Sequence, residues 1–170
     1  EPRLDFLLRF GAYPSIVDLS EQEARIELDE LVSNYLYRDA LAFVGMSKST
    51  VLIKLLELLA RQIGQEISYQ EIGQALGVDR RTVVNYVDLL EQCFILFRLG
   101  AFSRNLRKEV AKSVKIYFYD LGVRNSLIQN FAPLALRNDV GALWENFCIV
   151  ERMKYLRYHQ QFANQYFWRT

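Results

Sequence analysis

The sequence is poor in the residues that bind metals or act as nucleophiles. Its 170 residues include one histidine, His159, and two cysteines, Cys93 and Cys148, far apart in the chain. A zinc site needs several Cys or His side chains at close spacing, so this composition argues against one. Ser–His–Asp chemistry would have to rely on His159 alone, late in a helical pattern. We expect both cysteines to be buried free thiols in a reducing cytoplasm.

Long apolar runs are missing as well. The longest, Val51–Ala60, is interrupted by Lys54 and Glu57, whereas a membrane-spanning helix needs about 20 mostly apolar residues. We therefore predict a cytoplasmic protein with no membrane contact. The chain has no signal peptide and no initial methionine, and its last residues, Tyr166–Thr170, are typical of the start of a strand. We expect it to be a fragment of a longer protein.

A phosphate-binding P-loop is also absent. The nearest approximation, Gly45–Ser49, lacks the upstream glycine loop after a strand that the Walker motif requires. We interpret it as a helix-capping loop. No cofactor site is therefore predicted for this chain.

Charge is distributed unevenly, although the formal net charge is only +1. Residues 1–65 and residues 66–97 each carry a net charge of −3, whereas residues 98–124 carry +5 and residues 125–170 carry +2. The positive charge is concentrated around Arg104–Lys115, and such a cluster favours binding to a polyanion.

Helix caps mark the first half of the chain. Ser20 and Glu23 have the spacing of a capping box, and the helix they begin should run to about Phe43. A second helix should begin at Ser49 and end near Gly64, with an apolar surface wide enough to contact neighbours on both sides.

The stretch from Ser68 to Ser113 predicts a helix-turn-helix followed by a basic hairpin. Ser68 caps a short helix, Gly77 supplies the positive φ of a tight turn, and Asp79 caps a second helix. Two apolar runs, Cys93–Phe97 and Val114–Tyr119, are suited to strands. We therefore predict a winged helix within residues 48–122.

The remainder predicts a short helix, a linker and a long helix. The short helix follows Asp120 and runs through Ile128, and Pro133 marks the linker. Asp139 should cap the long helix, and a strand should begin at Tyr166. The predicted fold is mainly α with small β (α+β). The winged helix is flanked by an N-terminal helical segment, residues 1–47, and by a long helix plus strand within residues 123–170.

The second helix of the helix-turn-helix is the first candidate for nucleic-acid contact. DNA-reading helices place polar side chains in their exposed N-terminal turns. The candidates are Arg80, Arg81 and Asn85, with Thr82 and Tyr86 beside them. Two arginines oppose the helix dipole, and a bound phosphate would relieve that cost. Acidic neighbours, Asp79, Asp88 and Glu91, oppose this interpretation.

The second candidate is the basic segment of the predicted wing. Five cations fall within twelve residues, with only Glu109 in opposition: Arg104, Arg107, Lys108, Lys112 and Lys115. We predict non-specific phosphate contacts from these side chains. The alternative is a solvated loop whose charges keep the protein soluble.

Several blocks resemble a known group of proteins. They are Leu8–Pro14, Tyr35–Asp39, Phe102–Glu109, Lys115–Asn125, Gly141–Phe147 and Phe167–Thr170. In this order they resemble the C-terminal half of bacterial and archaeal AAA+-like P-loop ATPases, a region catalogued as a domain of unknown function. The resemblance implies an ATPase domain upstream, which would bind ATP and Mg²⁺ and dock with this region. It also implies a restriction-endonuclease-like domain whose beginning would be residues 123–170.

In that nuclease-like fold, a helix glutamate joins other carboxylates to hold Mg²⁺, and Glu145 matches it. One glutamate cannot hold the ion alone, so we expect this fragment to be inactive as a nuclease. The alternative is that Glu145 is an ordinary helix acid or the partner of a nearby arginine.

Three functions therefore remain open from the sequence. The first is a non-catalytic accessory region of an ATPase that contacts nucleic acid. The second is a protein-interaction or assembly module with no nucleic-acid role, and the third is part of a Mg²⁺-dependent nuclease. The sequence leaves the oligomeric state open.

Overall fold

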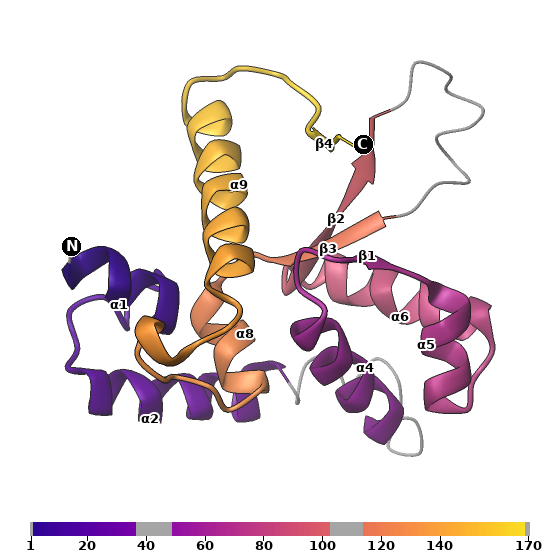
Figure 1. Ribbon diagram of the computed structural model, residues 1–170, viewed down its shortest axis with the longest axis horizontal. Helices are drawn as coiled ribbons and strands as arrows, with labels where there is room; N and C mark the ends of the chain where they lie inside the picture. Colours follow the sequence, from indigo (N-terminus) through magenta and orange to yellow (C-terminus); the bar gives the residue numbers. More distant parts are fainter. Residues whose placement is uncertain (1, 37–48, 103–113, 169–170) are drawn as a thin grey trace.

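A computed structural model describes residues 2–36, 49–102 and 114–168. Within these ranges the protein has an α+β fold, mainly helical with one small mixed sheet (Figure 1). In chain order the elements are α1 (Pro2–Phe10), α2 (Glu21–Leu31), the π-helical turn η1 (Val32–Leu36), α4 (Ser49–Arg61), β1 (Glu66–Ile67), α5 (Tyr69–Leu76), α6 (Arg80–Gln92), β2 (Leu96–Ala101), β3 (Val114–Phe118), α8 (Leu121–Leu127), the 3₁₀ turn η3 (Leu134–Leu136), α9 (Val140–Tyr158) and β4 (Tyr166–Phe167).

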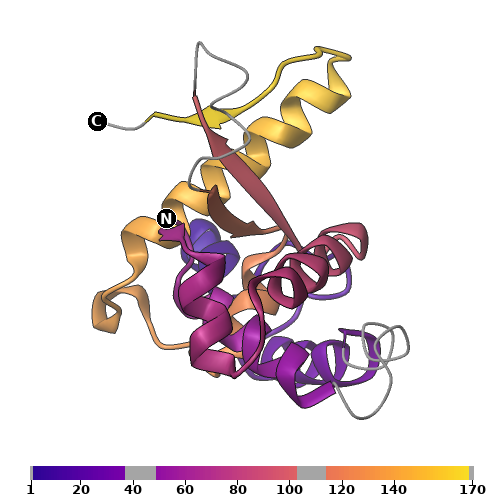
Figure 2. The ribbon, with the colours of Figure 1, turned by 90° about the vertical axis from the view of Figure 1, so that its right-hand side faces the viewer.

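The sheet has the strand order β1-β3-β2-β4. β3 pairs antiparallel with both β1 and β2, while β4 runs parallel to β2 with Gly100 opposite Tyr166. The pairing of the two central strands and the strand at Tyr166 are thus confirmed. In both views β4 and the C-terminal end of β2 lie on the side of the sheet away from α4 (Figures 1 and 2).

The first predicted strand of this pair was placed too early. We expected it at Cys93–Phe97, but β2 begins at Leu96. Phe94 adopts a φ of +55°, and the Ile95 N–H donates to the carbonyl of Leu90 at 3.1 Å. These features close α6 with a left-handed turn, so the apolar run is divided between a helix end and a strand.

The caps predicted at Ser20, Ser68 and Gly77 are confirmed. Ser20 forms the capping box with Glu23 at the start of α2, and Ser68 accepts a hydrogen bond from the N–H of Glu71. Gly77 ends α5 with a φ of +69°. The helix predicted from Ser20 is α2, which ends at Leu31 and continues directly into the π-helical turn η1 as far as Leu36. Its predicted end near Phe43, and Gly45 beyond it, lie outside the described residues.

One hydrophobic core contains residues from all three predicted segments. It includes Leu8 of α1, Leu55 of α4, Val87 of α6, Phe118 of β3 and Val150 of α9. A smaller cluster between α1, α2 and the segment after α8 contains Phe10, Ile16, Ala24, Leu28 and Phe131. In the described part of the chain, no helix is long and apolar enough to cross a membrane.

The two cysteines are not both buried. Cys93 is partly buried at the end of α6, and Cys148 is exposed on α9. The expectation of a buried Cys148 was wrong because apolar side chains occur all round α9, and one side of it is left in solvent with Trp144, Tyr155 and Tyr158.

Candidate nucleic-acid interface

The N-terminal turn of α6 presents two arginines to solvent. The Asp79 carboxylate accepts hydrogen bonds from the N–H of Thr82 at 2.7 Å and from its hydroxyl at 3.1 Å. These bonds keep the pKa of Asp79 below its usual value. Arg80, Arg81 and Asn85 are all exposed. The cap thus fixes the turn from which these three side chains project.

Neither arginine forms an ion pair at contact distance with a described residue, although the charge of Arg81 contributes to the lowered pKa of the neighbouring Asp79. The Arg80 guanidinium lies 5.9 Å from the centre of the Tyr69 ring, and neither side chain forms an ion pair there. Two cations at the positive end of a helix dipole are unfavourable without a counter-ion. The arrangement is therefore suited to an anion.

The acidic side chains farther along α6 are paired with a strand residue. Arg98 of β2 forms ion pairs with Asp88, at 2.8 Å, and with Glu91. Glu91 also accepts the backbone N–H of Arg98 at 2.9 Å. Burial opposes the charge of Arg98, but the hydrogen bonds that Arg98 donates and the negative charge of Glu91 together outweigh burial, and the pKa of Arg98 is raised. Two of the three acids that argued against phosphate contact, Asp88 and Glu91, are thus paired, whereas Asp79 remains exposed at the start of α6.

Tyr86 does not belong to this surface. Its side chain is buried in the hydrophobic core beside Val83, Val87 and Leu90. The expectation that it borders the exposed face was wrong, because it lies one turn before Leu90 on the inward side of α6.

Most of the predicted wing lies outside the described residues. This applies to Arg104, Arg107, Lys108 and Lys112. Lys115 is described, and its ammonium pairs with the Glu145 carboxylate at 3.1 Å and lies 5.3 Å from the centre of the Phe167 ring. It would have to leave these contacts in order to bind phosphate.

Two side chains of β3 donate hydrogen bonds to Glu145. Its Oε1 atom accepts hydrogen bonds from Lys115 and, at 2.8 Å, from the Tyr117 hydroxyl. Burial and the neighbouring carboxylate both raise the pKa of Tyr117. No group of three or more His, Cys, Asp or Glu side chains that could hold a metal ion occurs in the parts of the chain that the structure describes. The nuclease-like role of Glu145 stays a prediction.

Sequence reasoning missed a buried charge cluster that joins α8 to the start of α9. Asp139 accepts hydrogen bonds from Arg124 at 2.5 Å and from Arg137 at 2.7 Å, and Arg124 also donates to the carbonyl of Ala60 at 2.7 Å. Desolvation opposes ionisation of Asp139, but the two arginines outweigh it and lower its pKa to about 2.

The expectation that the Asp139 side chain caps α9 was wrong. The residue occupies the cap position but makes no side-chain cap hydrogen bond. Its two oxygens are taken by Arg124 and Arg137 instead.

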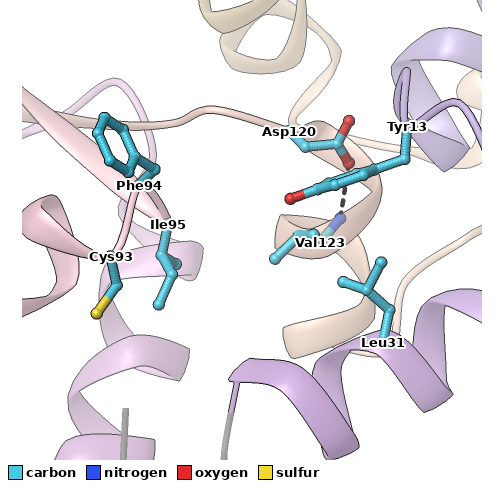
Figure 3. A pocket seen from close by; sticks show the side chains of 7 residues that line it. All are labelled: Tyr13, Leu31, Cys93, Phe94, Ile95, Asp120 and Val123. Carbon is cyan, nitrogen blue, oxygen red and sulfur yellow. Dashed lines mark hydrogen bonds between the residues drawn. The ribbon is translucent and has the colours of Figure 1, made fainter. Parts of the chain in front are cut away.

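Two of the sequence blocks that carry the resemblance, Leu8–Pro14 and Lys115–Asn125, contact each other at Asp120. Its carboxylate accepts the N–H of Ala12 at 2.7 Å and that of Val123 at 3.1 Å. Burial raises the pKa of Asp120 above its usual value, against the effect of these bonds. Figure 3 shows the Tyr13 ring beside Asp120, across a small cavity from Phe94. At about 20 Å³ the cavity has room for a water molecule but not for a substrate.

The chain is similar to longer prokaryotic proteins. It is 30% identical over 122 residues to Uncharacterized protein MJ1637 of Methanocaldococcus jannaschii, covering 71% of this chain and 26% of that protein. It is 30% identical over 166 residues to Uncharacterized protein Rv2008c of Mycobacterium tuberculosis, covering 96% of this chain and 36% of that protein. The chain thus spans roughly a quarter to a third of the length of these relatives.

A Haemophilus influenzae protein is 22% identical over 125 residues, covering 71% of this chain and 31% of that protein. No solved structure matches the chain. The family model described as Domain of unknown function (DUF8612) matches residues 1–134, and the chain therefore belongs to this family.

Proposed function

We propose that this chain is a non-catalytic accessory region of a larger AAA+-like P-loop ATPase, and that it contacts nucleic acid through α6 and the basic segment 103–115. The greater length of the relatives supports a larger parent protein. ATP and Mg²⁺ would bind to the P-loop domain that the sequence blocks imply. This chain would dock with that domain and supply the contact with its target.

The order of elements supports a winged helix in this region. α4, β1, α5, α6, β2 and β3 follow one another as helix, short strand, helix, turn, helix and two paired strands. β1 joins the sheet beside β3, and Gly77 makes the tight turn between α5 and α6. In such folds the second helix of the helix-turn-helix enters the major groove of DNA.

The observation that carries the proposal is which charged side chains of α6 form ion pairs and which do not. Arg80 and Arg81 are exposed without ion pairs in the described structure, whereas Asp88 and Glu91 are paired with Arg98. The exposed N-terminal end of α6 is therefore cationic, although the surrounding segment has a negative net charge. A phosphate backbone is the anion that fits an exposed pair of arginines.

The double substitution Arg80→Glu/Arg81→Glu should weaken binding to random-sequence duplex DNA by about tenfold or more. Each lost phosphate contact also reduces the dependence of log K on log salt, by about 0.9 per contact. Fluorescence anisotropy at two salt concentrations measures both quantities. The matched control is Arg3→Glu/Arg25→Glu, which makes the same charge change on α1 and α2, across the molecule from α6 (Figure 1).

If both double variants lost the same amount of DNA affinity, the loss would come from the change in overall charge, and α6 would not be part of the interface. The absence of duplex binding at low salt in the unaltered chain would overturn the proposal as a whole.

Protein assembly is the second candidate function, and the solvent side of α9 favours it. Trp144, Tyr155 and Tyr158 are exposed there together with Cys148. Exposed aromatic side chains of this kind are common at protein interfaces. Under this alternative, changing Arg104, Arg107 and Lys108 to Glu would alter self-association or docking to the ATPase domain and leave DNA affinity unchanged.

A further inference from the structure

The solvent side of α9 carries a regular line of exposed residues. Trp144, Cys148, Glu151, Tyr155 and Tyr158 follow one another in steps of four, three, four and three residues, and all five are exposed. The exposed fractions of the three aromatic side chains are 47%, 46% and 78%. Alternating steps of this kind keep side chains on one narrow stripe of a helix, as in the seam of a coiled coil. We call these five residues the α9 seam.

The seam is open to a partner helix. α9 is 19 residues long, and in both views its C-terminal half projects beyond the other helices (Figures 1 and 2). The opposite side of the helix is buried in the protein through Leu143, Asn146 and Val150, which fixes the direction in which the seam faces. A narrow line of exposed aromatic side chains on a well-packed helix is suited to docking against a second helix.

The seam is complementary in shape to a second, antiparallel copy of itself. If Trp144 lies opposite the partner's Tyr155, two-fold symmetry places Tyr155 opposite the partner's Trp144. The same register places Tyr158 opposite the partner's Gly141. Gly141 has no side chain, and a Cβ atom built on it would meet nothing within 4 Å. The most exposed aromatic side chain of the seam therefore faces open space on the partner helix.

Charge favours the antiparallel arrangement over the parallel one. In the antiparallel register Arg152, on one flank of the seam, lies near the partner's Glu145. Arg152 is exposed and has no ion pair in the described structure, and the hydrogen bonds from Lys115 and Tyr117 both go to the Oε1 atom of Glu145. A parallel pair would instead place Glu151 opposite the partner's Glu151, and like charges at a seam oppose pairing.

We propose that two copies of this chain pair through the α9 seam, antiparallel and related by a two-fold axis. The inference goes beyond the proposed function, because it depends on α9 and not on α6. A single helix pair about 28 Å long buries less surface than a standard protein interface, so the pairing is weak, with a Kd of roughly 10–100 µM.

Sedimentation velocity of the unaltered chain tests the pairing directly. Between about 5 µM and 1 mM, the sedimentation coefficient should rise from that of a monomer towards that of a dimer. Trp144→Ala should raise the Kd by about tenfold or more, because it removes a central aromatic contact. Phe94→Ala removes an aromatic side chain that is exposed outside α9 and should leave the Kd unchanged. A chain that stays monomeric at about 1 mM, or equal effects of the two variants, would overturn the inference.

A second substitution should strengthen the dimer. Glu151 is the charged residue of the seam, and its carboxylate pairs with Lys154 at 2.7 Å. Glu151→Leu should lower the Kd by about tenfold or more, because a leucine side chain would be buried between the two helices. Glu71→Leu makes the same change at an exposed position of α5 and should leave the Kd unchanged. An equal gain in both variants, or no gain in Glu151→Leu, would contradict the seam.

Disulfide cross-linking tests the orientation of the pair. In the antiparallel register Cys148 lies opposite the partner's residue 151. One chain therefore keeps Cys148, a second carries Cys148→Ser/Glu151→Cys, and both carry Cys93→Ser. With a mild oxidant the mixture should form a cross-linked dimer and neither chain should do so alone, since equivalent residues are then too far apart for a disulfide. A parallel pair would give the reverse result and overturn the proposed arrangement.

Discussion

Replacing Asp139 with asparagine should lower the free energy of unfolding by about 3 kcal/mol, because it leaves two buried guanidinium groups without their counter-ion. The Arg124 and Arg137 side chains are 2% and 0% exposed, and the Asp139 side chain is 19% exposed. Water therefore cannot replace the lost carboxylate. Urea unfolding should show a lower midpoint with an unchanged m value.

The Asp139 carboxylate should also determine how the free energy of unfolding changes in acid. Its pKa is lowered on folding from 3.8 to about 2, so its ionised form stabilises the native state at higher pH. This contribution, about 2 kcal/mol, is complete above about pH 5 and is lost as the pH falls through 3.8 towards 2 and below. Asp139→Asn should be less sensitive to acid over that range than the unaltered protein.

Asp18 provides the matched control for both measurements. It is exposed, and Asp18→Asn should change the free energy of unfolding by less than about 0.5 kcal/mol. A loss below about 1 kcal/mol in Asp139→Asn, or an acid profile that does not change, would show that the two arginines are stabilised by other groups.

The contrast between Asp139 and Asp79 shows which hydrogen bonds can be predicted from the sequence and which cannot. Asp79 caps α6 through Thr82, three residues away, and the spacing alone predicts this bond. Asp139 occupies an equivalent position before α9, but it bonds to Arg124, which belongs to another helix. A periodic pattern describes neighbours within one element and contains no information on which distant side chain competes for an oxygen.

The same limit applies to the candidate interface. The exposure of Arg80, Arg81 and Asn85 follows from their places in the first turns of an amphipathic helix. The neutralisation of Asp88 and Glu91 does not, because Arg98 lies on the next strand. Lys115 and Glu145 were each singled out in the sequence for separate reasons. Their contact with each other depends on α9 packing beside β3, which no local pattern predicts.

Replacing Gly122 with alanine should be the other strongly destabilising change, with an expected loss of about 3 kcal/mol. A Cβ atom on Gly122 would lie 2.1 Å from the carbonyl oxygen of Phe10 and 3.0 Å from Asp120 Oδ1. The first of these neighbours is backbone and cannot move without separating α1 from α8, which pack together. Steric overlap of this kind in a packed interior typically costs about 1–3 kcal/mol, and backbone overlap is at the upper end.

Gly141 provides a control of opposite sign for this prediction. It lies near the start of α9, and a Cβ atom there would meet nothing within 4 Å. Gly141→Ala should therefore stabilise the protein by up to about 1 kcal/mol through its higher helix propensity. Thermal or urea unfolding of the two variants measures the difference directly. If Gly122→Ala were as stable as the unaltered chain, the close approach of α1 to α8 would be wrong, and with it the position of the Gly11–Tyr13 loop against Asp120.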